Sequence, residues 1–178
     1  KQRIQDVLLT VAKNRVLLYL ILGGILVSLG YSQFSSTLPQ LIDLNVENAV
    51  KIFSYCVVAN SITVLVFQYP LTMLLEKTSI IKAISIGISI FALGLLLFNF
   101  STSMWMFIGS MVIFSLGEIL AFPLMGAAIE RIAPVDQKAI YLGAGQLNNI
   151  GGFIGPIFGG WLLVNLIGGM YIVIAAFM

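Results

Sequence analysis

Apolar residues form long blocks along the chain, and charged residues separate these blocks at the spacing that a bilayer requires. The hydrocarbon core of a membrane is crossed by about 20 apolar residues in a helix. Two charge-free blocks, 83–117 and 139–178, are too long for one helix each, and polar breaks at 99–103 and 164–169 divide them. The pattern therefore predicts an all-α membrane protein with the following spans, the last of them truncated: 16–41, 52–75, 83–98, 104–128, 139–163 and 170–178.

Lysine and arginine are distributed unequally between the two sides of this predicted bundle. Eight of the nine fall on one side, and Lys51 is the one on the other. Because an excess of Lys and Arg marks the cytoplasmic side, we expect a multi-pass protein of the cell inner (plasma) membrane with a cytoplasmic N-terminus. Ahead of the transmembrane bundle of residues 16–178, residues 1–15 place apolar side chains on one helical face. They are expected to form the end of a cytoplasmic amphipathic linker, the alternative being a simple extension of the first span.

Composition supports the membrane assignment and narrows the function. The chain is 60% hydrophobic and 9% charged, whereas soluble domains carry about 25% charged residues. It has no histidine and one cysteine, Cys56, so a metal site of the His/Cys type is not expected. A membrane-embedded enzyme would need a nucleophile–base pair or metal ligands, and we therefore expect neither an enzyme nor a cofactor. The net charge of +2 lies mostly in short loops and does not indicate a nucleic-acid partner.

Glu118 is the one charged residue deep inside a predicted span. It is the fifteenth of the 25 residues in span 104–128, near the middle of the helix. A charge at the bilayer centre costs from about 2.5 to above 10 kcal/mol, and no Lys, Arg or His lies inside any predicted span. Desolvation favours the protonated carboxyl group, and an arriving cation favours its ionisation. Glu118 is therefore interpreted as a proton- and substrate-coupling group facing the bundle. The alternative is a protonated glutamate that hydrogen-bonds a neighbouring helix.

Polar and aromatic side chains in the spans are candidates for a substrate path. Aromatic and methionine residues on the helix face of Glu118 suit flat lipophilic cations, although such residues are also ordinary in a core. Amide side chains in other spans need partners in lipid, and an interhelical hydrogen bond is as plausible for each as a contact with substrate. The substrate-path candidates are Gln33, Asn60, Phe114, Phe122, Met125 and Asn149.

Glycine and proline mark positions where helices pack closely or bend. Gly151, Gly155 and Gly159 are four residues apart, which places them on one helix face and allows another helix to approach closely. Pro123 and Pro156 each remove a backbone donor and crowd a carbonyl of the preceding turn. We therefore expect bends at or beside both prolines.

Three stretches together resemble one half of a major facilitator superfamily transporter, in the group of bacterial drug:proton antiporters. They are "YSQFSSTLPQ" in the first span, "YPLTMLLEKTSIIKAISIG" at 69–87, and "LGEILAFP" followed by "IERIAP". The resemblance implies a six-span half of a twelve-span bundle, in which Glu118 binds protons or a cationic substrate. Peptide transporters of the same superfamily carry a similar glutamate, so the motif leaves the substrate open.

The glycine- and proline-rich segment around Gly151 and Gly155 resembles an antiporter motif usually found in the fifth span of the N-terminal half. The full loop motif of that half, with its Asp-Arg and Gly-Arg pairs, is absent between the second and third spans, which favours the C-terminal half. The expected function is proton-coupled export of lipophilic or cationic compounds, with the other half, protons, a small-molecule substrate and the bilayer as partners. The alternatives are a proton-driven importer of peptides or other nutrients, and a non-transport scaffold or channel subunit.

Overall fold

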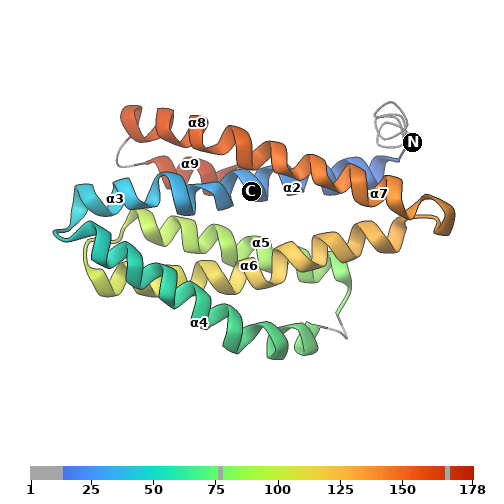
Figure 1. Cartoon of the computed structure of the whole chain (residues 1–178), viewed down its shortest axis with the longest axis horizontal. Coiled ribbons are helices and arrows are strands. Elements are labelled where there is room, and N and C mark those ends of the chain that lie inside the picture. Colours follow the sequence, from blue (N-terminus) through green and yellow to red (C-terminus); the bar gives the residue numbers. More distant parts are fainter. Residues whose placement is uncertain (1–13, 76–77, 167–168) are drawn as a thin grey trace.

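The computed structural model describes residues 14–75, 78–166 and 169–178, and within these ranges the chain folds into helices joined by turns, without a strand (Figure 1). Most of the expected linker 1–15 lies outside the described residues. The elements are α2 (Arg15–Ser36), α3 (Leu38–Asn45), α4 (Ala49–Leu75), α5 (Ile80–Asn99), α6 (Met104–Ile132), η1 (Val135–Gln137), α7 (Lys138–Gly145), η2 (Gln146–Asn148), α8 (Asn149–Asn165) and α9 (Met170–Ala176).

Five helical segments of the described chain are long and apolar enough to cross a membrane. They correspond to the first five predicted spans, and several run past the predicted ends. For example, α6 begins at Met104 as expected but continues to Ile132. Short α9 occupies the position of the predicted sixth span. The all-α fold class predicted from the hydropathy pattern is confirmed for the described residues.

Two of the spans are interrupted where the sequence pattern suggested one helix. The first is broken at Thr37, where α2 ends and α3 begins. Pro39 lies in the first turn of α3, where its missing N–H group is tolerated. The fifth span contains the 3₁₀ segment η2 (Gln146–Asn148) between α7 and α8, and 3₁₀ turns inside a helix often mark a functional hinge.

The bundle is held together by a few extensive helix pairs. Figure 1 shows α2 beside α8 on one side of the molecule, and α4 with α5 and α6 on the other. The α5–α6 pair is the most extensive, and α9 packs against α5. Aromatic side chains fill the space between them, and the largest buried ones are Phe91, Phe98, Phe107, Phe114 and Tyr171.

The glycine stripe on α8 lies directly against α2. A Cβ atom added at Gly151 would lie 2.9 Å from the backbone nitrogen of Leu29, and one at Gly155 would lie 2.9 Å from the Leu29 carbonyl oxygen. At Gly159 the added atom would contact the side-chain amide of Gln33. Only residues without a side chain allow the two backbones to come this close, so the stripe sets the distance between α2 and α8.

The two span prolines predicted to bend their helices lie inside regular helical structure. Helix α6 continues through Pro123, and α8 continues through Pro156. A bend at either residue therefore remains a prediction. The interruption of the fifth span that the structure does show lies at η2, earlier in the chain than Pro156.

Candidate functional site

Glu118 lies midway along α6 and its side chain faces two other helices. The amide Nδ2 of Asn60, on α4, donates to Glu118 Oε2 over 2.8 Å. The phenol of Tyr31, on α2, is also placed to hydrogen-bond this carboxyl group. The half-buried side chain thus points into the bundle, as the sequence predicts.

Asn60 uses both of its amide hydrogens at this junction. Its second N–H group donates to Ser115 Oγ over 2.9 Å, and Ser115 in turn donates to the carbonyl oxygen of Met111 over 2.7 Å. Among the described residues, these two bonds from Asn60 are the only side-chain hydrogen bonds between α4 and α6. The polar contact between the two helices is therefore concentrated at Asn60 and depends on Glu118.

The groups that bind Glu118 are neutral. The one ion pair among the described residues joins Lys138 to Glu130 over 3.1 Å, on the exposed surface. An amide or phenol N–H or O–H can donate to a carboxylate and equally to the carbonyl oxygen of a protonated acid. The arrangement therefore accommodates both states of Glu118. No group of His, Cys, Asp and Glu in the described chain could hold a metal ion.

Aromatic rings from α5 and α6 cluster around Tyr31 of α2. Tyr31 lies edge-on to Phe122 with ring centroids 5.0 Å apart, and it stacks on Phe114 at 6.1 Å. Phe114 is fully buried and also packs against Phe91 at 4.4 Å, so it lies in the core. Tyr31 was not among the predicted site residues. Its position inside an apolar span could have marked Tyr31 as a candidate, because a buried phenol hydroxyl group needs a hydrogen-bond partner.

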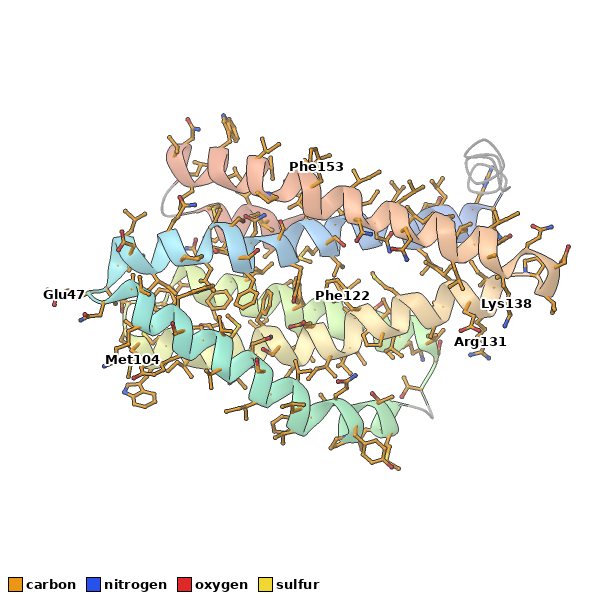
Figure 2. The ribbon with its side chains drawn as sticks, in the orientation of Figure 1. Glu47, Met104, Phe122, Arg131, Lys138 and Phe153 are labelled. Atoms are coloured by element: carbon orange, nitrogen blue, oxygen red, sulfur yellow. The ribbon has the colours of Figure 1, made fainter. Side chains whose placement is uncertain are left out.

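Three of the predicted substrate-path residues, Phe122, Met125 and Asn149, line one open pocket of about 200 Å³ between α2, α6 and the α7–α8 region. Phe122 lies one helical turn from Glu118, and Figure 2 shows it between α2 and α6. Polar groups of Ser28 and Asn148 complete one wall of the pocket. The pocket therefore combines an aromatic ring and a pliable thioether with hydrogen-bonding groups.

Gln33 lies away from this pocket. It is fully buried, and its Nε2 atom donates to the carbonyl oxygens of Leu29 and Gly155, each over 2.9 Å. Its Oε1 atom accepts a bond from Thr37 over 3.0 Å, and the Thr37 hydroxyl group also pairs with the Tyr171 hydroxyl group at 3.1 Å. The sequence left open whether Gln33 contacts substrate or bonds another helix, and the structure shows the bond to another helix.

Asn149, by contrast, is exposed in the pocket and donates to Gln146 over 3.1 Å.

Membrane-length apolar helices that enclose a polar group at half their length define the chain as part of an integral membrane protein. The family model of the Major Facilitator Superfamily matches residues 11–178, and the chain belongs to this superfamily of transporters.

Two curated relatives show how much of a whole transporter the chain represents. The uncharacterized MFS-type transporter YqjV of Bacillus subtilis (strain 168) is 28% identical over 167 residues, which are 93% of this chain and 40% of the relative. The uncharacterized MFS-type transporter YdeE of Escherichia coli (strain K12) is 29% identical over 157 residues, 86% of this chain and 40% of the relative. The chain thus spans about 40% of the length of these relatives.

Proposed function

We propose that the full-length protein exports lipophilic or cationic compounds in exchange for protons, and that Glu118 binds the proton and the cation in turn. The observation that carries this proposal is a mid-span carboxyl group that accepts a hydrogen bond from the neutral amide of Asn60 on α4, with the neutral phenol of Tyr31 on α2 close by. In the proposed arrangement the chain is the C-terminal six-span half. The substrate would lie near the midplane, between this half and the other.

Exchange at Glu118 follows from the desolvation of its carboxyl group. Without a cation nearby, the low dielectric disfavours the ionised form, and a proton neutralises it. A lipophilic cation can supply the same neutralisation, and an aromatic face such as Phe122 attracts it further. The proton and the cation therefore compete for one group, which is what exchange requires.

The state of Glu118 also affects the contact between α4 and α6. A hydrogen bond to an ionised carboxylate is roughly twice as strong as one to a neutral acceptor, so the bond from Asn60 weakens when Glu118 takes up a proton. Helix α4 packs mainly on α6 and on short α3, and few other contacts hold it. Protonation is therefore expected to loosen α4, a change suited to alternating access.

The orientation proposed for the protein places the N-terminal side of α2 in the cytoplasm. Figure 2 shows Arg131 and Lys138 at one end of the bundle, and Glu47 and Met104 at the other. The start of α2 lies at the first of these ends, because Asn14 donates to the Tyr141 hydroxyl group over 3.0 Å. The basic end would be cytoplasmic by the positive-inside rule.

A second candidate function is proton-driven import of peptides or other polar nutrients. The observation that favours it is the amide-rich wall of the pocket, which includes Gln146, Asn148 and Asn149. Such groups suit a ligand that carries several hydrogen-bonding groups, whereas a lipophilic cation uses few of them.

The direction of proton movement distinguishes export from import. Inverted vesicles that contain the full-length protein are energised until their lumen is acidic, and a panel of cationic dyes or short peptides is then added outside. An exporter that exchanges dye for protons makes the lumen more alkaline. The peptide panel is also added to vesicles that have not been energised, in which an importer running in reverse carries protons inward with the peptide and acidifies the lumen. If neither panel moves protons beyond the level of vesicles without the protein, proton-coupled transport of both substrate classes is ruled out.

A further inference from the structure

An apolar groove on the outside of the bundle lies between residues 55–62 of α4 and residues 104–108 of α6. The groove has a volume of about 360 Å³. Its walls are accessible, since Val58 and Ile62 are 54% and 55% exposed and Trp105 is 74% exposed. Within the described ranges of the chain, no other element contributes to its lining, which consists of Tyr55, Val58, Ala59, Ile62, Met104, Trp105 and Ile108.

This groove is separate from the candidate transport site. Successive residues of a helix are rotated by about 100°, so Val58 and Ile62 each stand about 160° around α4 from Asn60. Asn60 contacts Glu118, and Phe53 contacts Phe34 of α2 with ring centroids 5.8 Å apart. The groove therefore opens on the flank of α4 that faces away from α2 and Glu118.

A cation stands at one end of the groove. The ammonium Nζ of Lys51 lies 5.9 Å from the centroid of the Tyr55 ring, which lines the groove. Lys51 forms no ion pair within the described residues, although Asp43 and Glu47 precede it closely in the sequence. Tyr55 and Trp105 are residue types that concentrate at the membrane–water interface. The groove thus has a basic, aromatic end and an apolar body.

We propose that this groove binds one phospholipid, with an acyl chain between α4 and α6 and the phosphate beside Lys51. The apolar wall from Tyr55 to Ile62 extends about 10 Å along α4 at 1.5 Å per residue, which matches the upper part of an acyl chain. A lysine ammonium attracts a phosphate as a point charge. An amphiphile with one anionic group and a long apolar chain satisfies both ends of the groove, whereas a soluble anion satisfies only one.

The test is native mass spectrometry of the full-length purified protein titrated with palmitoyl-oleoyl phosphatidylglycerol. Lys51→Gln should weaken retention of one lipid molecule by about fivefold, the effect of a single basic residue near an anionic headgroup. Lys51→Arg keeps the charge and should retain the lipid. Lys82→Gln is the matched control, because Lys82 is an exposed lysine far along the sequence from the groove, and it should leave retention unchanged. Deacylated glycerophosphoglycerol and inorganic phosphate should not be retained.

Two results would overturn this proposal. One is equal lipid retention by the parent and the Lys51→Gln variant. The other is protein covering the groove, detected when a cysteine placed by Ile62→Cys cross-links to another segment of the full-length protein in the membrane. If Lys51→Gln does not fold, Ile62→Trp, which fills the groove without altering its charge, should lower retention instead. Both readouts are independent of transport, so they do not depend on the proposed exchange of protons.

Discussion

The amide of Asn60 donates to the carboxyl oxygen of Glu118 across 2.8 Å, and this contact joins α4 to α6 halfway along the bundle. The same amide also holds Ser115. A single neutral side chain therefore carries the polar part of one helix contact and binds Glu118, the one Asp, Glu, Lys or Arg residue deep in the described spans. The stability of the α4–α6 contact and the state of Glu118 are linked through Asn60.

Replacement of Asn60 by leucine should destabilise the protein. Asn60→Leu removes both bonds to α6 and leaves Ser115 and Glu118 with one donor fewer each. Interhelical hydrogen bonds in membranes contribute about 0.6 kcal/mol on average, so a loss of about 1 kcal/mol is expected in thermal unfolding of the purified full-length protein. Ser61→Ala is the control, since Ser61 is exposed and bonds only to Val57 of its own helix. Equal stability of the two variants would show that the Asn60 bonds contribute little.

The pattern of apolar and charged residues predicted the helical spans and marked Glu118 as a candidate site. Lipid requires long apolar segments and makes a charge in the middle of a span exceptional. The break at Thr37 and the 3₁₀ segment Gln146–Asn148 were not predicted. Thr37 bonds to Gln33 and to Tyr171 of α9, and the side chain of Asn148 packs against Gly24 of α2. Hydropathy carries no information about such contacts. The spacing of the α8 glycines indicated a packing face, but its partner α2 could be known only from the fold.

Replacing glycine by alanine should have opposite effects on stability on the two faces of α8. At Gly155 an added Cβ atom meets the Leu29 carbonyl oxygen at 2.9 Å, whereas at Gly152 nothing lies within 4 Å. Gly155→Ala should therefore destabilise the full-length protein by about 1–3 kcal/mol through overpacking. Gly152→Ala should stabilise it by up to about 1 kcal/mol, because alanine favours a helix more than glycine does. Thermal unfolding of both variants measures the difference, and a stable Gly155→Ala variant would contradict the close contact with α2.

The buried bonds at the break in the first span should be costly to remove. Thr37→Val keeps the shape of the side chain but leaves Gln33 Oε1 and the Tyr171 hydroxyl group without their partner. An unpaired buried polar group costs about 1–3 kcal/mol, and unfolding should show a loss in that range. Thr72→Val is the control, because exposed Thr72 bonds only to the carbonyl of Gln68. In a double-mutant cycle, Tyr171→Phe should add little to Thr37→Val, and full additivity would show that the two hydroxyl groups are not coupled.

The exchange mechanism predicts different transport activities for two substitutions at Glu118. Glu118→Gln keeps the size and the bond from Asn60 but cannot release a proton, so efflux of cationic dyes driven by a pH gradient should fall to the background of empty vesicles. Neutral compounds should still move downhill. Glu118→Asp keeps a titrating group on a shorter side chain, and part of the activity should survive. Protein levels in the vesicles are compared by immunoblot, because a loss of folding would imitate a loss of coupling. Dye efflux at the parent rate by a normally abundant Gln variant would show that Glu118 is structural and that the proton binds elsewhere in the full-length protein.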